Sequence, residues 1–341
     1  MPLDHYIPQV HLKNFYSPVL GDRMYATRKS DLKSFTPNSK SVCGINDGST
    51  NAYLKEDRAI EEFLKKIEPK YNEALAKLIG DKIDEQCIYT IGGFVAYVVS
   101  CSPAGMRIQS GPLKSSVETV AAMVEAQGLI SPPPKELGGE SLVELLDTGA
   151  VKVEVDPKFP QAIGIRSIHR SLAIFGNFRW DILLNDFGHS PFFTSDFPAA
   201  IEETRDPRII NRIVPLAPNL AIRIRPDLTI DKNLADFSFA NFHYRRRSIS
   251  QKEVVEINRL IVRCAEDTVF YRDNSEWIQK FIEKNRHYRV EPIISKQPTR
   301  NGFLLSSMLK IVLVKAPHES PAVCPRSGFS NLGNYEPSAS V

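Results

Sequence analysis

The chain of 341 residues lacks the features that would place it in several common protein classes. Its five cysteines form no C-x-x-C pair, and their odd number is untypical of a secreted disulfide framework. No apolar run approaches the ~20 residues that cross a bilayer, and the most apolar segment, 87–101, contains two adjacent glycines. The amino-terminal segment has neither the basic start nor the apolar stretch of a signal peptide. We therefore expect a cytoplasmic protein with reduced thiols and no membrane contact.

Motifs of the common nucleotide and hydrolase sites are also missing. The sequence has no P-loop, no G-x-G-x-x-G, no G-x-S-x-G and no H-E-x-x-H. Lys and Arg number 43 and Asp and Glu 40, and a net charge of +3 indicates no particular partner. With 42% apolar and 24% charged residues, the composition is that of an ordinary globular protein.

Apolar residues recur at spacings of three and four along much of the chain, which predicts amphipathic helices. We expect helices over 56–79 with a kink at Pro69, and over 86–101, 115–128, 139–148, 158–177, 252–270 and 276–285. Apolar runs around turn residues predict two strand pairs, 179–184 with 191–194 and 212–216 with 220–224. The apolar run 303–314 is of uncertain type.

Helices, then strand pairs, then helices is not the alternation of a doubly wound sheet. The order predicts an α+β fold that is predominantly helical with a small antiparallel sheet. We expect one large globular unit over residues 1–316, with a helical part over 52–177 and a sheet-containing part over 178–316. Residues 317–341, rich in Pro, Ser, Gly and Asn, are predicted to be a disordered tail.

Several segments in a fixed order resemble one bacterial family. They are His5-Tyr-Ile-Pro-Gln9, the run Ile60–Glu68, Phe193-Thr-Ser-Asp196 after Trp180, Pro215–Leu220 and Ile257-Asn258. Together they are similar to the family catalogued as domain of unknown function 4238, over roughly residues 5–285. The family name implies no activity, so the resemblance bears on the boundaries of the fold.

Two polar motifs are candidates for catalysis. Pro8 stiffens the segment of His5 and Gln9, which would supply an acid–base group and an amide hydrogen bond. Ser195 and Asp196 follow an apolar strand, where Asp196 would be a base or metal ligand and Ser195 a nucleophile if a base lay within reach. We predict that the two motifs pack side by side. The alternative is structural: His5 binds a carbonyl, and Ser195 and Asp196 cap backbone N–H groups in a turn.

The sequence offers candidate ligands for a divalent metal ion but specifies no cofactor. Asp181, Asp186, His189 and Asp196 fall within 16 positions around the first predicted strand pair. Oxygen ligands with a histidine suit Mg²⁺ or Mn²⁺. Acids near a hairpin turn are usually solvated, however, and that interpretation is preferred here.

Basic residues concentrate between Arg205 and Arg247, where nine Lys and Arg face four Asp, a local charge of 9 − 4 = +5. The run His243-Tyr-Arg-Arg-Arg247 places aromatic rings beside guanidinium groups, which can hold phosphates and stack on bases. The predicted phosphate- or nucleic-acid-binding residues are Arg223, Arg225, Arg245, Arg246 and Arg247. The alternative is a solvated basic face paired with nearby acids.

Three functions follow from these candidates. The first is a hydrolase, such as a nuclease, that uses His5 and Asp196 around a phosphate held by the arginines. The second is a non-catalytic module that binds nucleic acid or another polyanion. The third is a component that interacts with other proteins.

Overall fold

The computed structural model describes residues 2–131, 136, 140–230, 235–299 and 302–314. It is 39% helix and 24% strand, with four sheets among these residues. The prediction of a predominantly helical fold with one small sheet is therefore wrong, and the protein is a mixed α+β fold. The predicted tail over 317–341 lies outside the described residues.

The largest sheet has five strands in the order β10-β5-β9-β8-β7. Along β5, buried Trp180 and Ile182 alternate with residues of the opposite face. β8 and β9 form the second predicted strand pair, which is confirmed. β10 was missed because its charged, exposed residues lack apolar alternation; it pairs in parallel with β5. The strands are β5 (Arg179–Leu184), β7 (Ala200–Glu203), β8 (Ile210–Ala217), β9 (Leu220–Arg225) and β10 (His243–Ser248).

The first predicted strand pair does not exist as a hairpin. β5 pairs with β9 and β10, whereas the segment expected to return beside it ends in a short strand of another sheet. That second sheet has the order β3-β2-β11-β6 and joins the start of the chain to its last third. Its strands are β2 (Tyr25–Arg28), β3 (Ser34–Phe35), β6 (Thr194–Ser195) and β11 (Thr268–Tyr271). β1 (Leu3–His5) and β4 (Gly44–Asn46) pair separately.

Helices cover the large sheet, and most of them follow the predicted pattern. The helix expected over 56–79 is indeed broken at Pro69, and Asp84 caps α4 by accepting the Cys87 N–H. α4 packs against α2, α3, α7 and α8. Gly93 permits the close approach of α2, because a Cβ at this position would lie 2.2 Å from Ile67 Cδ1. The segments are α1 (Gln9–Lys13), α2 (Ala59–Ile67), η1 (Glu68–Lys70), α3 (Tyr71–Ile79), α4 (Glu85–Cys101), α7 (Lys158–Arg166) and α8 (Ile168–Asn177).

Two helices near the carboxyl-terminal end complete the body. α9 (Gln251–Cys264) begins with a capping box formed by Ser250 and Glu253. It ends earlier than predicted because the backbone turns extended at Ala265 and residues 268–271 form β11 instead. α10 (Glu276–Asn285) has the predicted bounds.

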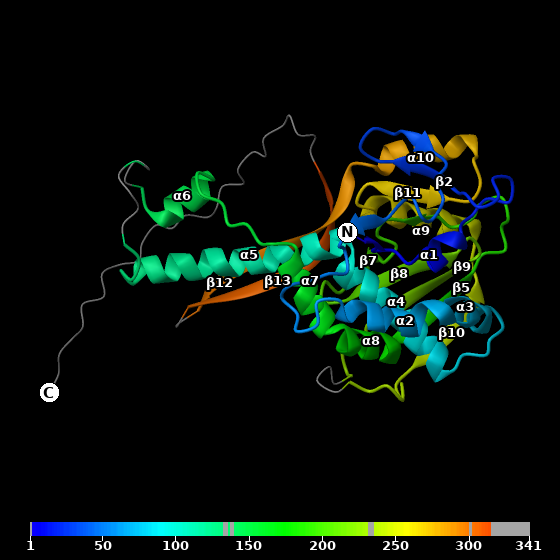
Figure 1. Ribbon diagram of the computed structural model, residues 1–341, viewed down its shortest axis with the longest axis horizontal. Coiled ribbons are helices and arrows are strands. Elements are labelled where there is room, and N and C mark those ends of the chain that lie inside the picture. The colour runs from blue at the N-terminus through cyan, green and yellow to red at the C-terminus, as the bar shows by residue number, and fades with distance from the viewer. Residues whose placement is uncertain (1, 132–135, 137–139, 231–234, 300–301, 315–341) are drawn as a thin grey trace.

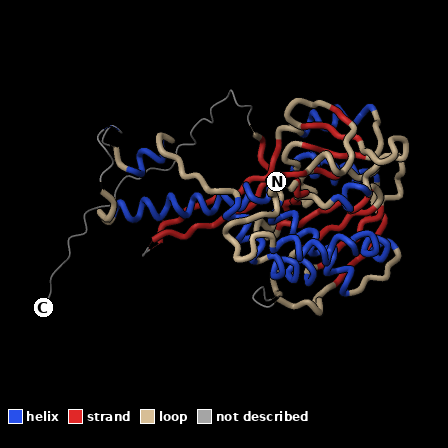
Figure 2. Tube along the Cα trace, viewed as in Figure 1, coloured by secondary structure: helices blue, strands red, loops and turns tan. Residues whose placement is uncertain are grey.

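An elongated part, which we call the arm, projects from the body (Figures 1 and 2). It consists of α5 (Pro103–Ala126), α6 (Leu142–Thr148) and the hairpin of β12 (Tyr288–Thr299) and β13 (Gly302–Leu313). α5 starts twelve residues before the predicted 115, because Ser102 caps it and Pro103 occupies its first turn. The run 303–314 of uncertain type is therefore mostly a strand.

The longest helix among the described residues is α5, with 24 residues. None of their helices alone is long and apolar enough to cross a bilayer; α4 and α5 pass only as a pair, which is bent by 60°.

Candidate functional site

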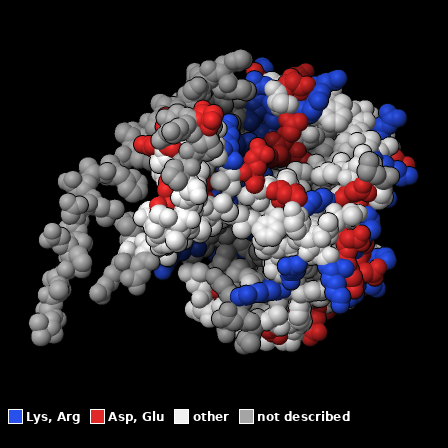
Figure 3. Space-filling model, turned by 60° about the vertical axis from the view of Figure 1, so that its left-hand side comes forward, with Lys and Arg blue, Asp and Glu red and all other residues white. Residues whose placement is uncertain are grey.

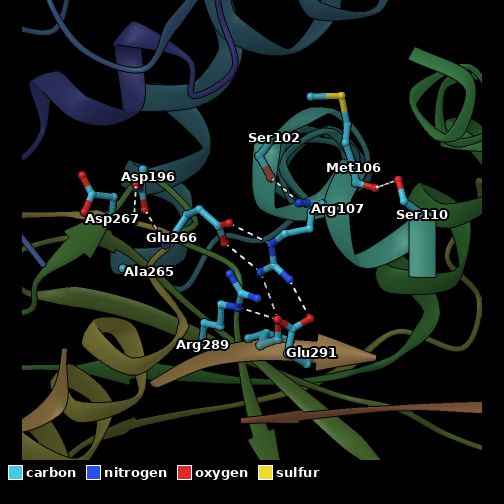
Figure 4. Close-up of polar contacts among 12 residues, drawn as sticks. Ser102, Met106, Arg107, Ser110, Asp196, Ala265, Glu266, Asp267, Arg289 and Glu291 are labelled. Carbon is cyan, nitrogen blue, oxygen red and sulfur yellow. Dashed lines mark hydrogen bonds and ion pairs between the residues drawn. The ribbon is translucent and has the colours of Figure 1, made fainter. Parts of the chain in front are cut away.

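The carboxylate of Asp196 caps backbone groups of a loop that is distant in sequence. Its Oδ1 accepts the Glu266 N–H at 2.9 Å, and its Oδ2 accepts the N–H groups of Asp267 and Thr268 at 2.8 Å each (Figure 4). The residue is only 6% exposed. Burial raises the pKa of Asp196 to about 6, although these N–H groups and the ammonium of Lys29 favour the charged form.

Lys29 is the buried cation of this region. Its Nζ donates to the carbonyls of Ala265 at 2.6 Å and Tyr288 at 2.8 Å. Burial lowers the pKa of Lys29 to about 8, against the attraction of Asp196. The Asp196 carboxylate and the Lys29 ammonium therefore both bind backbone groups of the loop that enters β11, and Lys29 also binds the start of β12.

Ser195 has no arrangement that would activate it as a nucleophile. It is buried, and its Oγ accepts the Phe197 N–H at 3.2 Å in a local turn. The histidine that reaches β6 is His11, whose Nε2 lies 2.8 Å from Thr194 Oγ1 and whose Nδ1 lies 2.8 Å from the Tyr71 hydroxyl. Burial lowers the pKa of His11 to about 3, so the ring is neutral and ties α1 to α3 and β6. Sequence reasoning missed this role; the only signal was the apolar Leu12 and Phe15 around it.

His5 and Gln9 lie beside one another on the amino-terminal segment. His5 Nε2 is 3.2 Å from the Lys40 carbonyl oxygen, and its Nδ1 is 3.5 Å from Gln9 Nε2. Tyr6, on the same segment, donates its backbone N–H to the Cys43 carbonyl at 2.9 Å, and burial, together with Cys43 and the Asp196 charge, raises the pKa of the Tyr6 hydroxyl. The small cavity beside His5 measures about 10 Å³, room for about one water.

The loop capped by Asp196 also holds the arm. The carboxylate of Glu266 accepts two hydrogen bonds from Arg107 of α5, both 2.8 Å, and Arg107 donates another to Glu291 of β12 at 2.8 Å (Figure 4). Arg289 pairs with the same Glu291. Asp196 thus belongs to a structural network that runs from the sheets of the body to the root of the arm.

A second buried carboxylate, Asp181 on β5, is surrounded by arginines. Its Oδ1 accepts from Arg225 at 2.9 Å and lies 3.4 Å from Arg245, and its Oδ2 lies 3.6 Å from Arg223. The register explains this convergence, because Arg245, Asp181 and Arg223 stand opposite one another on β10, β5 and β9. The next row of the same face holds His243, Arg179 and Arg225.

The predicted run on β10 is divided between the two faces of the sheet. Arg245 and Arg247 share the face of Asp181, and Arg247 pairs with Glu253 of α9 at 2.6 Å. Arg246 lies on the other face with Tyr244 and donates to the Ile79 carbonyl at 2.7 Å. The aromatic rings and the guanidinium groups therefore do not form one interleaved surface.

On the face of the body that Figure 3 shows, Lys and Arg lie beside Asp and Glu. One surface hollow of about 400 Å³ is lined by Lys65, Lys66, Lys70, Tyr89 and two further residues. The described residues contain no group of three His, Cys, Asp or Glu that could hold a metal ion. Of the four candidate ligands, Asp181 lies on β5 of the five-stranded sheet, whereas Asp196 follows β6 of the four-stranded sheet.

The fold and these sites define a mixed α+β protein with a buried carboxylate network and an arginine-bearing sheet edge. The chain belongs to the family described as protein of unknown function DUF4238, whose model matches residues 4–275. The match includes both buried aspartates and ends before the β12–β13 hairpin. No curated protein and no solved structure matches the chain.

Proposed function

We propose that the protein is a non-catalytic module that binds nucleic acid through the arginines around Asp181. We call this surface the arginine face; it consists of Arg179, Arg223, Arg225, Arg245 and Arg247. The observation that supports it most is the convergence of Arg223, Arg225 and Arg245 on one carboxylate of β5, next to the exposed edge strand β10.

The exposed and the inner arginines of this face have different partners. Arg223 is 16% exposed and pairs with Glu202 at 2.9 Å, and Arg247 pairs with Glu253. Arg225 and Arg245 are 45% and 61% exposed and share Asp181. Each guanidinium has five N–H donors, so the shared carboxylate leaves donors of these two side chains accessible.

The balance of charge on the arginine face favours an anion. Its five arginines face four carboxylates, those of Asp181, Glu202, Asp227 and Glu253, which gives 5 − 4 = +1. Arg179, which pairs with Asp227 at 3.3 Å, is itself 66% exposed. Strands lie about 4.8 Å apart, so neighbouring guanidinium groups can contact successive phosphates of a polymer.

The polar groups of the other candidate site do not support hydrolysis. Both oxygens of Asp196 are bound by backbone N–H groups, and Ser195 and Asp196 are buried. Since a general base must reach the substrate, binding without chemistry is the function that the geometry favours.

The test is fluorescence anisotropy with labelled single-stranded DNA, single-stranded RNA and duplex DNA over a range of salt concentrations. The double variant Arg225→Gln, Arg245→Gln should bind at least about tenfold more weakly. The slope of log affinity against log salt should fall by about 1.4 to 1.8, because each of the two lost phosphate contacts contributes about 0.7 to 0.9.

The matched control is Arg208→Gln, Lys114→Gln, which removes the same charge from exposed positions elsewhere. It should leave the salt slope nearly unchanged. An equal loss in the control, or no affinity of the wild type for any of the three nucleic acids at low salt, would show that the arginine face is not a nucleic-acid site.

A further inference from the structure

The two edges of the arm hairpin differ in their capacity to accept another strand. β12 and β13 pair with each other over twelve residues and with no further strand that the structure describes. In an antiparallel pair, residues alternate between those bonded to the neighbouring strand and those whose N–H and C=O point away from it. The N–H and C=O groups that point away from the neighbouring strand form the two outer edges of the hairpin.

The outer edge of β12 is blocked by prolines. Pro292 and Pro298 are six residues apart, so their main-chain groups point to the same side of β12. Neither residue has an N–H to donate to a further strand. β12 also packs on α5, where a Cβ at Gly111 would lie 2.6 Å from Pro292 Cγ. A further strand cannot form a regular ladder on this side.

The outer edge of β13 presents the main-chain groups of its odd-numbered residues. Ile311 N–H points away from β12, since it donates to Glu203 Oε1 at 3.1 Å, whereas Val314 N–H donates inward to the His287 carbonyl at 2.6 Å. By the same alternation, Leu305, Ser307 and Leu309 direct their N–H and C=O groups outward. Among the described residues, Glu203 protects this edge at its end near the body.

The distal part of this edge has none of the usual protection against pairing. Residues 302–309 contain no charged residue and no proline, and Leu304 is 56% exposed. The edge strand β10, by contrast, has three consecutive arginines. Edge strands normally carry charges, prolines or bulges that prevent association, so an unprotected apolar edge on a projecting arm marks an interaction surface.

We infer that the free edge of β13 pairs in antiparallel fashion with the same edge of a second copy of this chain. The sequence around Ser307 is self-complementary: an alignment centred on Ser307 places Leu305 of each copy opposite Leu309 of the other. It forms about six main-chain hydrogen bonds over residues 305–309. Lys310 falls opposite Leu304, so no like charges meet.

The same geometry ends the association at two copies. Pairing of the two β13 edges creates one sheet in the order β12-β13-β13-β12, whose outer edges are both β12. Because those edges carry the prolines, no third hairpin can add. A closed two-fold dimer follows, with the same surface used by both copies.

The test uses charge substitutions at the centre of the proposed pairing. Ser307 is exposed, so Ser307→Lys and Ser307→Glu should not change folding, which circular dichroism and the unfolding midpoint check. In sedimentation equilibrium, wild type at micromolar concentrations should have twice the chain mass of 38.3 kDa. Each variant should dissociate at least about tenfold more readily, because like charges would lie directly opposite. An equimolar mixture of the two variants should recover the dimer.

The matched control is Lys296→Glu, which changes the charge on the blocked strand β12 and should leave the dimer intact. A wild type that stays monomeric, or Ser307 variants that dimerise like wild type, would overturn the inference. A mixture that stays monomeric would show that the two Ser307 residues do not face each other, which rejects the proposed pairing. Nucleic-acid binding by the arginine face is measured separately and does not depend on these results.

Discussion

Asp181 and Asp196 are both buried carboxylates, but their surroundings differ in kind. Asp196 accepts three backbone N–H groups and lies near one buried lysine, so its partners belong to the fold itself. Asp181 is approached by three arginine side chains, two of which are substantially exposed. The first arrangement fixes a loop, whereas the second holds cations at a surface. Burial of an acid therefore does not by itself indicate a functional site, and the exposure of its partners has to be considered as well.

The largest expected effect is that of Asp196→Ala. Three backbone N–H groups would lose their acceptor, and the buried Lys29 ammonium would lose a nearby negative charge, which should lower the free energy of unfolding by about 3–5 kcal/mol. Urea unfolding measures this change. Hydrogen exchange should also increase at residues 266–268 and in the root of the arm, since Glu266 holds Arg107.

The control for this substitution is Asp186→Ala, an exposed acid only ten positions away. It should change the stability by less than about 0.5 kcal/mol. Asp196→Ala with the stability of wild type would mean that the N–H groups find water instead, and that the carboxylate is available for another role.

The pKa of Asp196 predicts a smaller effect that depends on pH. Because the pKa is raised from 3.8 to about 6, the folded state takes up this proton before the unfolded state does. The contribution of Asp196 to stability therefore increases as pH falls from about 6 to 4 and is lost as pH rises through 6. Relative to Asp196→Asn, wild type should gain at most about 3 kcal/mol over this range.

This prediction is checked by urea unfolding of wild type and Asp196→Asn at pH 4, 5, 6 and 7. Subtraction of the two curves removes the other carboxylates that titrate in acid. A difference that shrinks as pH falls would place the pKa of Asp196 below its ordinary value, with the three N–H groups outweighing burial.

Sequence patterns predicted those parts of the fold that are fixed locally. The break at Pro69, α4 and the β8–β9 pair follow from spacing and turn residues within one segment. β10 could not be recognised, because it becomes a strand through parallel pairing with β5, which lies more than sixty positions earlier. The first predicted strand pair, 179–184 with 191–194, was wrong for the same reason, since the strands that pair with β5 are distant in sequence.

The candidate sites show the same division between local and distant contacts. The predicted alternatives for His5, a bond to a carbonyl, and for Ser195, a local turn, are both present. Asp196 does cap N–H groups, but those of residues 70 to 72 positions away, which no local pattern encodes. The arginines around Asp181 were identified by local charge, while their shared carboxylate depends on the register of three strands.

The smallest expected effect on the free energy of unfolding is that of Asp181→Ala, which removes the carboxylate that the arginines share. Its arginine partners reach solvent, so the loss should be about 1–2 kcal/mol, less than for Asp196→Ala. The deficit should shrink with added salt, because the variant removes the shared counterion of Arg225 and Arg245, which lie beside Arg223, and salt screens the repulsion among the three guanidinium groups. Binding of nucleic acid should become tighter, since one acid leaves the arginine face.

The matched comparison is Asp181→Asn, which retains one oxygen acceptor but no charge and should fall between wild type and Asp181→Ala in stability. Measurements of unfolding and anisotropy on the same samples separate the two roles of this residue. If Asp181→Ala loses stability independently of salt and binds nucleic acid no better, the arginines are held by the fold in the way that the loop at Asp196 is. The distinction between the two carboxylates would then rest on exposure alone, and the arginine face would be a structural ion-pair network.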